Sequence, residues 1–365
     1  MDPATLESLI VKEIRKAKTI SRRDLAENLS IAKSTAGRRI DSMIERGLVR
    51  ENGIEERKVA GRPRRFLALR GEYGAYAGFD FEARHLFGVL TDFDHGTLER
   101  RKIRLSAHPS RDEVLSHIRE LLTEFQSLPA GARLIGTGIG VPGPVRRADR
   151  VGIYYPYLEG WRNVNLAEEL ALDPSVLHIE NNTRSVALAE YWHGPYTGTD
   201  NLLCFTVRTG LAAAIITNGA LVTGLHEMAG EVRGWPVEGN LWLEKAASVR
   251  AVTDGEPPGG DKWKEFVSQC QEGDGAALAT LDGAAKHHGE ALARMVQLLD
   301  PAVIFLSGPF TELEDLYLDR VRSAVMSALE GHFFTPPPIH AATLGEFSGA
   351  HGAAALAAAE TMLKG

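Results

Sequence analysis

The sequence predicts a chain in two parts: a small N-terminal module of three helices and two strands, followed by a large α/β body. Three observations predict this organisation. The first 70 residues combine helical apolar spacing with many basic residues, the remainder alternates short apolar runs with helical segments, and glycine-rich turns follow two of the apolar runs. A chain of 365 residues is also too long for one ordinary core and suits two or three domains.

Charge is distributed unevenly along the chain. Residues 1–70 contain 17 lysines and arginines against 10 acidic residues, a net charge of +7. Because the whole chain contains 41 basic and 48 acidic residues, the remainder has 24 against 38, a net charge of −14. Phosphates attract the first part and repel the second, so we expect polyanion binding in residues 1–70 only. A solvated basic face is the alternative.

The first two helices of the N-terminal module have clear boundaries in the sequence. A helix is expected at about residues 5–15, with apolar side chains on one face. Ser21 stands three residues before Asp24, so its hydroxyl can cap a short second helix that ends near Leu29. The small side chain of Ala26 lets this second helix approach the next one closely.

The third helix is expected at about residues 33–46, with Ala36, Ile40 and Ile44 facing inward. Such a spacing is that of a helix-turn-helix, whose third helix enters the major groove through its first turns. The DNA contacts that we predict from this helix are Lys33, Ser34, Thr35, Arg38 and Arg39. An oligomerisation or linker module of three helices is the alternative.

Two short strands are expected after the third helix, at residues 48–50 and 66–69, with Gly-Arg-Pro at residues 61–63 between them. Pro63 fixes its own backbone and keeps Arg62 extended. This pattern predicts a wing in which Arg62, Arg64 and Arg65 reach a minor groove or phosphates. A solvated basic hairpin is again the alternative.

The body is predicted to be α/β, because apolar strands alternate with helices from about residue 72. Strands are expected at residues 75–81, 86–91, 134–141, 202–207, 212–217 and 303–307, with glycine-rich turns at 136–144 and 208–210. Cys204 and Cys270 are the only cysteines, which excludes a disulfide framework and a cysteine-rich zinc site. The sequence has no apolar run long enough for a membrane helix and no secretory pattern at its start, so we expect a cytoplasmic protein that does not contact a membrane.

Several motifs of the body occur in an order and spacing that resemble the ROK family (repressors, open reading frames and kinases). They are GIGVPGPV at 138–145, ENNTRSVALAE at 180–190, RTG at 208–210, NGALVTGLHEMAGE at 218–231, LDPAVIFLSGP at 299–309 and a Gly-Ala-rich C-terminal helix. The resemblance implies a two-domain actin/hexokinase-like body behind a winged helix-turn-helix of residues 1–70. Its small α/β domain would comprise residues 72–188 and 346–365, and its large one residues 189–345.

Departures from the kinases of this family concern the residues that transfer phosphate. Family kinases carry Asp-x-Gly-Gly-Thr on the first hairpin, where this chain has Asp80-Phe-Glu82-Ala-Arg, and Glu82 opposes a phosphate by charge and by size. The family's catalytic aspartate corresponds to Asn182, whose amide is not a base. The second phosphate turn, Gly-Thr-Gly in the family, begins here with Arg208. We therefore predict no catalytic residue and no nucleotide cofactor.

The resemblance also implies a sugar site, part of which this chain keeps. Asn181, Glu231 and Glu244 match residues that hydrogen-bond sugar hydroxyls in the family. The effector-binding residues that we predict are Pro142, Gly143, Asn181, Asn182, Glu231 and Glu244. A structural role in the interdomain cleft is the alternative for each of the polar ones.

Zinc ligands of the family are replaced in this chain. The histidine position is Gly234, and other residues stand in place of the cysteine motif at 237–243, so we predict no zinc. Leu241 and Trp242 are expected to fill the vacated volume as core.

These features predict a sequence-specific DNA-binding regulator, expected to be a repressor, that a small-molecule effector controls. The effector would be a sugar or a sugar derivative, and the DNA a palindromic duplex bound by a homodimer or a dimer of dimers. Two alternatives stay open. One is an ATP-dependent sugar kinase with an appended DNA-binding head, and the other is a constitutive regulator without an effector.

Overall fold

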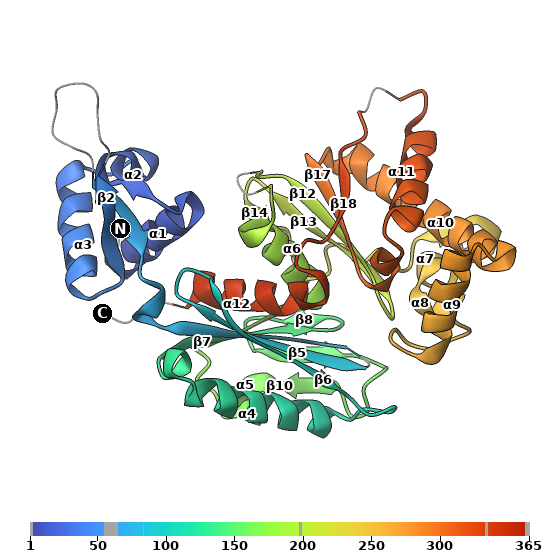
Figure 1. Cartoon of the computed structure of the whole chain (residues 1–365), viewed down its shortest axis with the longest axis horizontal. Coiled ribbons are helices and arrows are strands. Elements are labelled where there is room, and N and C mark those ends of the chain that lie inside the picture. The colour runs from blue at the N-terminus through green and yellow to red at the C-terminus, as the bar shows by residue number, and fades with distance from the viewer. Residues whose placement is uncertain (1–2, 55–64, 83, 197–198, 333–334, 362–365) are drawn as a thin grey trace.

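The computed structural model describes the whole chain except residues 1–2, 55–64, 83, 197–198, 333–334 and 362–365. Figure 1 shows three parts: an N-terminal head, a small lobe beside it, and a large lobe farther along the molecule. Each lobe is built on a five-stranded sheet, which confirms the predicted α/β body.

The head has the three predicted helices and the two predicted strands, and one further short strand, β1, that was not predicted. Its elements are α1 (Pro3–Ala17), β1 (Ile20–Ser21), α2 (Arg22–Asn28), α3 (Lys33–Glu45), β2 (Val49–Ile54) and β3 (Arg65–Leu69), with the strands ordered β1-β3-β2. The Ser21 hydroxyl accepts a hydrogen bond from the Asp24 N–H at 3.2 Å and so caps α2 as predicted. Ala26, Ala36 and Ile40 are buried between the helices, which confirms the predicted packing of α2 against α3.

The small lobe has the strand order β11-β7-β4-β5-β6, in which β4, β5 and β6 are antiparallel and β7 and β11 run parallel to β4. These strands are β4 (Ala75–Phe81), β5 (His85–Asp92), β6 (Thr97–Arg104), β7 (Leu134–Val141) and β11 (Leu177–Asn181). The other elements are α4 (Arg111–Ser127), β8 (Val145–Arg146), β9 (Val151–Tyr154), β10 (Arg162–Asn165) and α5 (Leu166–Leu170). Helix α4 covers one face of the sheet, and the C-terminal helix α12 (Ser348–Glu360) covers the other (Figure 1).

Helix α12 lies unusually close to its neighbours because glycines face it. A side chain at Gly78 of β4 would overlap the Ala350 carbonyl of α12, and one at Gly138 of β7 would overlap the Ala353 carbonyl. From the other side, Gly352 of α12 meets the backbone of Ser185 in α6 (Asn182–His193). Helices α6 and α12 therefore form a tight pair, and α6 also packs on strands β12 and β13 of the large lobe.

The large lobe has the strand order β14-β13-β12-β17-β18. Its strands are β12 (Leu202–Val207), β13 (Leu211–Thr217), β14 (Ala220–Leu221), β17 (Val303–Ser307) and β18 (Ile339–Ala341), with a separate hairpin of β15 (Pro236–Val237) and β16 (Leu241–Trp242). Its helices are α7 (Leu243–Ala247), α8 (Val249–Val252), α9 (Asp261–Glu272), α10 (Gly275–Leu299) and α11 (Asp315–Leu329).

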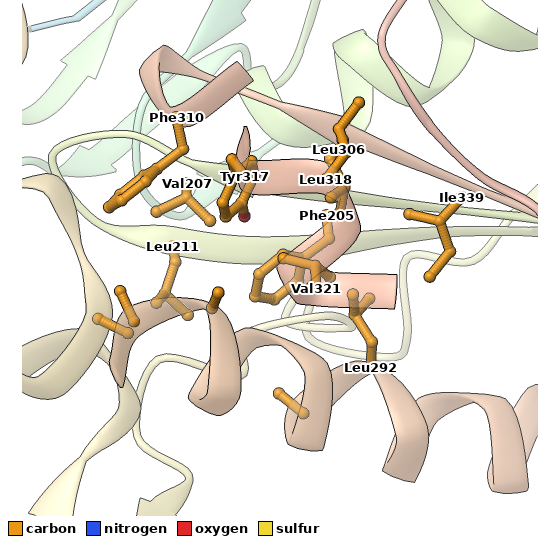
Figure 2. Packing of buried hydrophobic residues seen from close by; sticks show 14 of the residues in the cluster. Phe205, Val207, Leu211, Leu292, Leu306, Phe310, Tyr317, Leu318, Val321 and Ile339 are labelled. Carbon is orange, nitrogen blue, oxygen red and sulfur yellow. The ribbon is translucent and has the colours of Figure 1, made fainter. Parts of the chain in front are cut away.

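The core of this lobe lies between the sheet and helices α10 and α11. Figure 2 shows Phe205 and Leu306 of the sheet facing Leu292 of α10 and Val321 of α11. Both cysteines are buried packing residues, as expected. No helix among the described residues is long and apolar enough to cross a membrane.

One packing prediction was wrong. Leu241 and Trp242 do not fill the core, because their side chains are 46% and 53% exposed on the β15–β16 hairpin. The residue of this segment that enters the core is Leu243, which is fully buried, and Trp235 packs against the same cluster from the other end of the hairpin. The volume behind the hairpin is thus occupied by its flanking residues, which leaves the two strand residues facing solvent.

The close approach of α12 makes Gly352→Ala a sharp test of the fold. The new methyl group would collide with the Ser185 carbonyl, so we expect the substitution to destabilise the protein by about 1–3 kcal/mol. The matched control is Gly283→Ala in α10, where no atom lies within 4 Å of the added carbon. There the lower backbone entropy of alanine should stabilise by about 0.5–1 kcal/mol. Urea unfolding measures both, and equal effects of the two substitutions would contradict the packing described.

Candidate functional site

The outer face of α3 carries most of the DNA-binding residues predicted from this helix. Lys33, Ser34 and Arg38 are exposed, and Thr35 is half-buried. They occupy the first turns of the helix, whose N-terminal end faces solvent. The face therefore offers two cations and two hydroxyls to a groove, which are donors suited to phosphates and to the acceptor atoms of guanine.

Arg39 occupies a different position from the other four. Its guanidinium donates to Glu7 Oε1 of α1 at 3.0 Å, and Arg46 Nη1 lies 2.9 Å from Glu7 Oε2. The Glu7 side chain is only 4% exposed. The two arginines hold α3 against α1 through a buried carboxylate, an arrangement that the sequence analysis missed because it joins residues more than 30 positions apart.

The three wing arginines are only partly described. Arg65 begins β3, is exposed, and pairs with Glu51 Oε2 of β2 at 2.5 Å. Arg62 and Arg64 lie outside the described residues. Arg22 of α2 reaches the same Glu51 at 3.4 Å, so the carboxylate ties α2 to the base of the two strands.

A pocket of about 250 Å³ lies between the two lobes of the body. All six residues predicted to bind an effector line it: Pro142, Gly143, Asn181, Asn182, Glu231 and Glu244. The small lobe supplies the first two from the turn after β7 and the asparagines from the junction of β11 and α6. Glu231 and Glu244 come from the large lobe, so the pocket closes only when the two lobes meet.

Asn181 shapes the pocket through its backbone partners. Its side-chain oxygen accepts hydrogen bonds from the N–H groups of Thr183 and Arg184 and caps α6, while its Nδ2 donates to the Gly143 carbonyl at 3.0 Å. Gly143 has φ +78°, a left-handed conformation that glycine adopts without strain. The neighbouring Asn182 side chain makes no hydrogen bond to any described residue, so its amide is available to a ligand.

The pocket is also lined by aromatic residues that the sequence analysis missed. Tyr154 ends β9, Tyr155 and Tyr157 follow it, and the rings of Tyr155 and Tyr157 lie 5.4 Å apart. Burial raises the pKa of Tyr155, which stays a neutral phenol. Three tyrosines within four residues are a visible signal, because aromatic walls with a few polar groups are typical of small-molecule sites.

Carboxylates face the aromatic wall from the large lobe. Burial raises the pKa of Glu231, and Arg233 at 3.7 Å and Arg184 oppose that shift. Glu244 lies against Gly210, because a side chain at Gly210 would come too close to the Oε1 atom of Glu244. Carboxylates and amides beside aromatic rings can bind a compact polyhydroxyl molecule, with hydroxyls donating to the acids and C–H faces packing on the rings.

At the inner end of the pocket the residues at the end of β4 meet the residues that follow β12. Arg208 Nη1 lies 3.0 Å from Asp80 Oδ2, and the Thr209 N–H donates to Glu82 Oε1 at 2.9 Å. Asp80 is fully buried, and its burial raises its pKa to about 6 while Arg208 opposes the rise. Among the described residues no group of three or more His, Cys, Asp or Glu is arranged to hold a metal ion.

The head docks on the small lobe near the C-terminal end of α12. Arg15 of α1 is buried there, and its Nη2 donates to the Phe93 carbonyl at 2.8 Å. A cluster of His95, His193 and His351 lies behind it, with successive ring centroids 5.1 and 5.7 Å apart. Burial lowers the pKa of His193 and of His351 to about 4, so both rings are neutral at neutral pH.

Comparison with known proteins identifies both parts of the chain. The ROK family matches residues 76–360, and a winged helix-turn-helix DNA-binding domain matches residues 5–50. The xylose repressor of Bacillus subtilis is 24% identical over 339 residues, which cover 88% of this chain and 86% of that protein. The glucokinase of Thermotoga maritima is 24% identical over 274 residues, 67% of this chain and 85% of that protein.

Two solved structures share the fold. A ROK family transcriptional regulator, a homologue of the Escherichia coli MLC protein, aligns over 99% of this chain and 98% of its own with a TM-score of 0.79 and 20% identity. A ROK family glucokinase from Streptomyces griseus, solved with glucose and AMPPNP, covers 77% of this chain and 98% of its own with a TM-score of 0.66 and 22% identity. With its family match across both lobes and its winged head, the chain belongs to the ROK family.

Proposed function

We propose that the protein is a transcriptional repressor whose DNA binding is controlled by a sugar in the cleft between its lobes. The observation that carries the proposal is the combination of an exposed basic recognition helix with a kinase-type sugar pocket that lacks a catalytic base. Repressors and kinases share the body, and the head and the altered phosphate loops support the repressor. Relatives that match most of the chain are named xylose repressors.

The pocket supports a monosaccharide as effector. Its 250 Å³ are bounded by tyrosines on one side and by Glu231 and Glu244 on the other. We propose a pentose or a related neutral sugar, with D-xylose as the first candidate because of the names of the relatives. The pocket residues come from both lobes, so a bound sugar would alter how the lobes meet.

The DNA target that we propose is a palindromic duplex bound by a homodimer or a dimer of dimers. A symmetric dimer presents two recognition helices and reads two half-sites about one helical turn, or a multiple of it, apart. Lys33, Ser34, Thr35 and Arg38 would contact each half-site, with Arg65 and the other wing arginines on the backbone.

Kinase activity is the second candidate function, because glucokinases match the body. We expect no turnover of ATP with D-glucose or D-xylose in a coupled assay that uses the Thermotoga maritima glucokinase as positive control. Loss of a general base removes about 10²–10⁴-fold in rate. Asn182→Asp alone should not restore activity, because Arg208 and Glu82 still occupy the phosphate position. A turnover number near 1 s⁻¹, common for enzymes, would replace the repressor proposal with a kinase.

Arg38→Ala tests the DNA face. If Arg38 binds a guanine, its loss should weaken binding to the operator by about 1–3 kcal/mol and relax the preference at one position in each half-site. The operator comes from selection on randomised duplexes, and fluorescence anisotropy at fixed salt gives the affinities. Arg146→Ala is the control, because Arg146 is also an exposed arginine but lies on the body. Unchanged affinity and preference in Arg38→Ala would remove α3 from the interface.

Glu244→Gln tests the sugar pocket. D-xylose, followed by a panel of other monosaccharides, amino sugars and phosphosugars, should raise the melting temperature of the wild type by an amount that grows with the logarithm of the sugar concentration above the dissociation constant. Because a hydrogen bond to a charged group contributes about 1.5–3 kcal/mol, Glu244→Gln should weaken sugar binding about tenfold or more. Glu238→Gln on the neighbouring exposed loop is the control. A panel in which no compound shifts the wild type would favour a constitutive regulator.

A further inference from the structure

We propose that Arg208 is an interlobe latch: it holds the large lobe against Asp80 and Glu82 of the small lobe, in the place where kinases of this family bind nucleotide phosphates. Both former phosphate loops have changed character in this chain, one to acidic and the other to basic. In a kinase of the family each of these two loops would face a nucleotide phosphate, whereas here the two loops bind one another. The inference concerns the lobes alone and does not depend on the identity of the effector.

The contacts of the latch come from two different sheets. Asp80 is the penultimate residue of β4, and Glu82 is the first residue after that strand. Arg208 and Thr209 directly follow β12. The ion pair of Arg208 with Asp80, at 3.0 Å, is joined by the hydrogen bond from the Thr209 N–H to Glu82 at 2.9 Å. Glu82 Oε2 also lies 3.9 Å from Arg208 Nε. The two lobes are therefore joined at this point by one contact between side chains and one contact from a backbone N–H group.

The ion pair of the latch is buried in the interior and is not a contact on the surface. Asp80 is fully buried, and Arg208 is 8% exposed. An ion pair in such surroundings has lost its hydration, so removing one partner leaves a buried charge without compensation. The pair holds the lobes together only while both members are present.

The latch also separates two cavities. Glu82 and Arg208 line both the 250 Å³ pocket that holds the predicted effector residues and an adjoining cavity of about 690 Å³. Glu82 and Arg208 thus form the wall between the two cavities. A molecule in the smaller pocket rests against this wall, so the latch sets the inner limit of the effector site.

Helix α12 connects the latch with the head. A side chain at Gly349, in its first turn, would overlap the Asp80 carboxylate. At the opposite end of the helix, Ala358 and Ala359 line a small cavity together with residues of α1. Movement of Asp80 therefore acts on a helix that contacts the head directly.

The latch can be tested without any sugar by measuring the distance between the lobes. Spin labels are attached to Asp112→Cys on the small lobe and Asp261→Cys on the large lobe, both highly exposed, with the buried Cys204 and Cys270 replaced by alanine. Double electron–electron resonance is recorded on labelled full-length protein diluted with unlabelled protein, so that pairs within one chain dominate. The wild type should give one narrow distance distribution.

Arg208→Met should shift this distribution to longer distances or broaden it. The double substitution Asp80→Asn with Arg208→Met removes the same contact without leaving a buried charge, so it should fold and open the cleft in the same way. The control is Arg320→Met, which breaks a 2.6 Å ion pair with Asp282 inside the large lobe and should keep the wild-type distribution. Wild-type distributions in the double variant, or an equal change in the control, would overturn the latch.

Discussion

The body is built around one constraint, the direct contact of helix α12 with the backbone of its neighbours. Gly78 and Gly138 on the sheet and Gly352 on the helix leave no room for side chains at the contact. A chain packed this closely transmits small displacements, because no side chain can rotate to absorb them. The position of α12 is therefore set jointly by β4, β7 and α6, which contain or directly precede the cleft residues Asp80, Pro142 and Asn182.

This geometry places the two functional regions at opposite ends of one helix. The first turn of α12 lies beside Asp80 at the cleft, and its last turns lie beside α1 of the head. The contact with the head is itself buried, with Arg15 bound to the Phe93 carbonyl and three histidines packed behind it. The head is therefore held against the small lobe through buried contacts.

The cleft shows how a kinase body can serve regulation. Phosphoryl transfer needs a base and two loops that accept phosphate, whereas binding needs only the wall of the sugar pocket. In this chain the pocket wall carries the acids Glu231 and Glu244 and the amides Asn181 and Asn182. At the inner end of the cleft the two lobes are joined by the buried ion pair of Arg208 with Asp80.

The sequence by itself determined the local structure of the head. Ser21 before Asp24 predicted the cap of α2 and apolar spacing predicted α3, since each signal lies within a short stretch of chain. The resemblance to the ROK family implied six of the residues that line the cleft. Only the tertiary structure decided which distant residues meet. Arg39 was expected on DNA but pairs with Glu7, Leu241 and Trp242 were expected in the core but face solvent, and the partners of Arg208 lie 128 positions away in the case of Asp80. Long-range contacts depend on how whole lobes pack, and no pattern within a window of neighbouring residues contains that information.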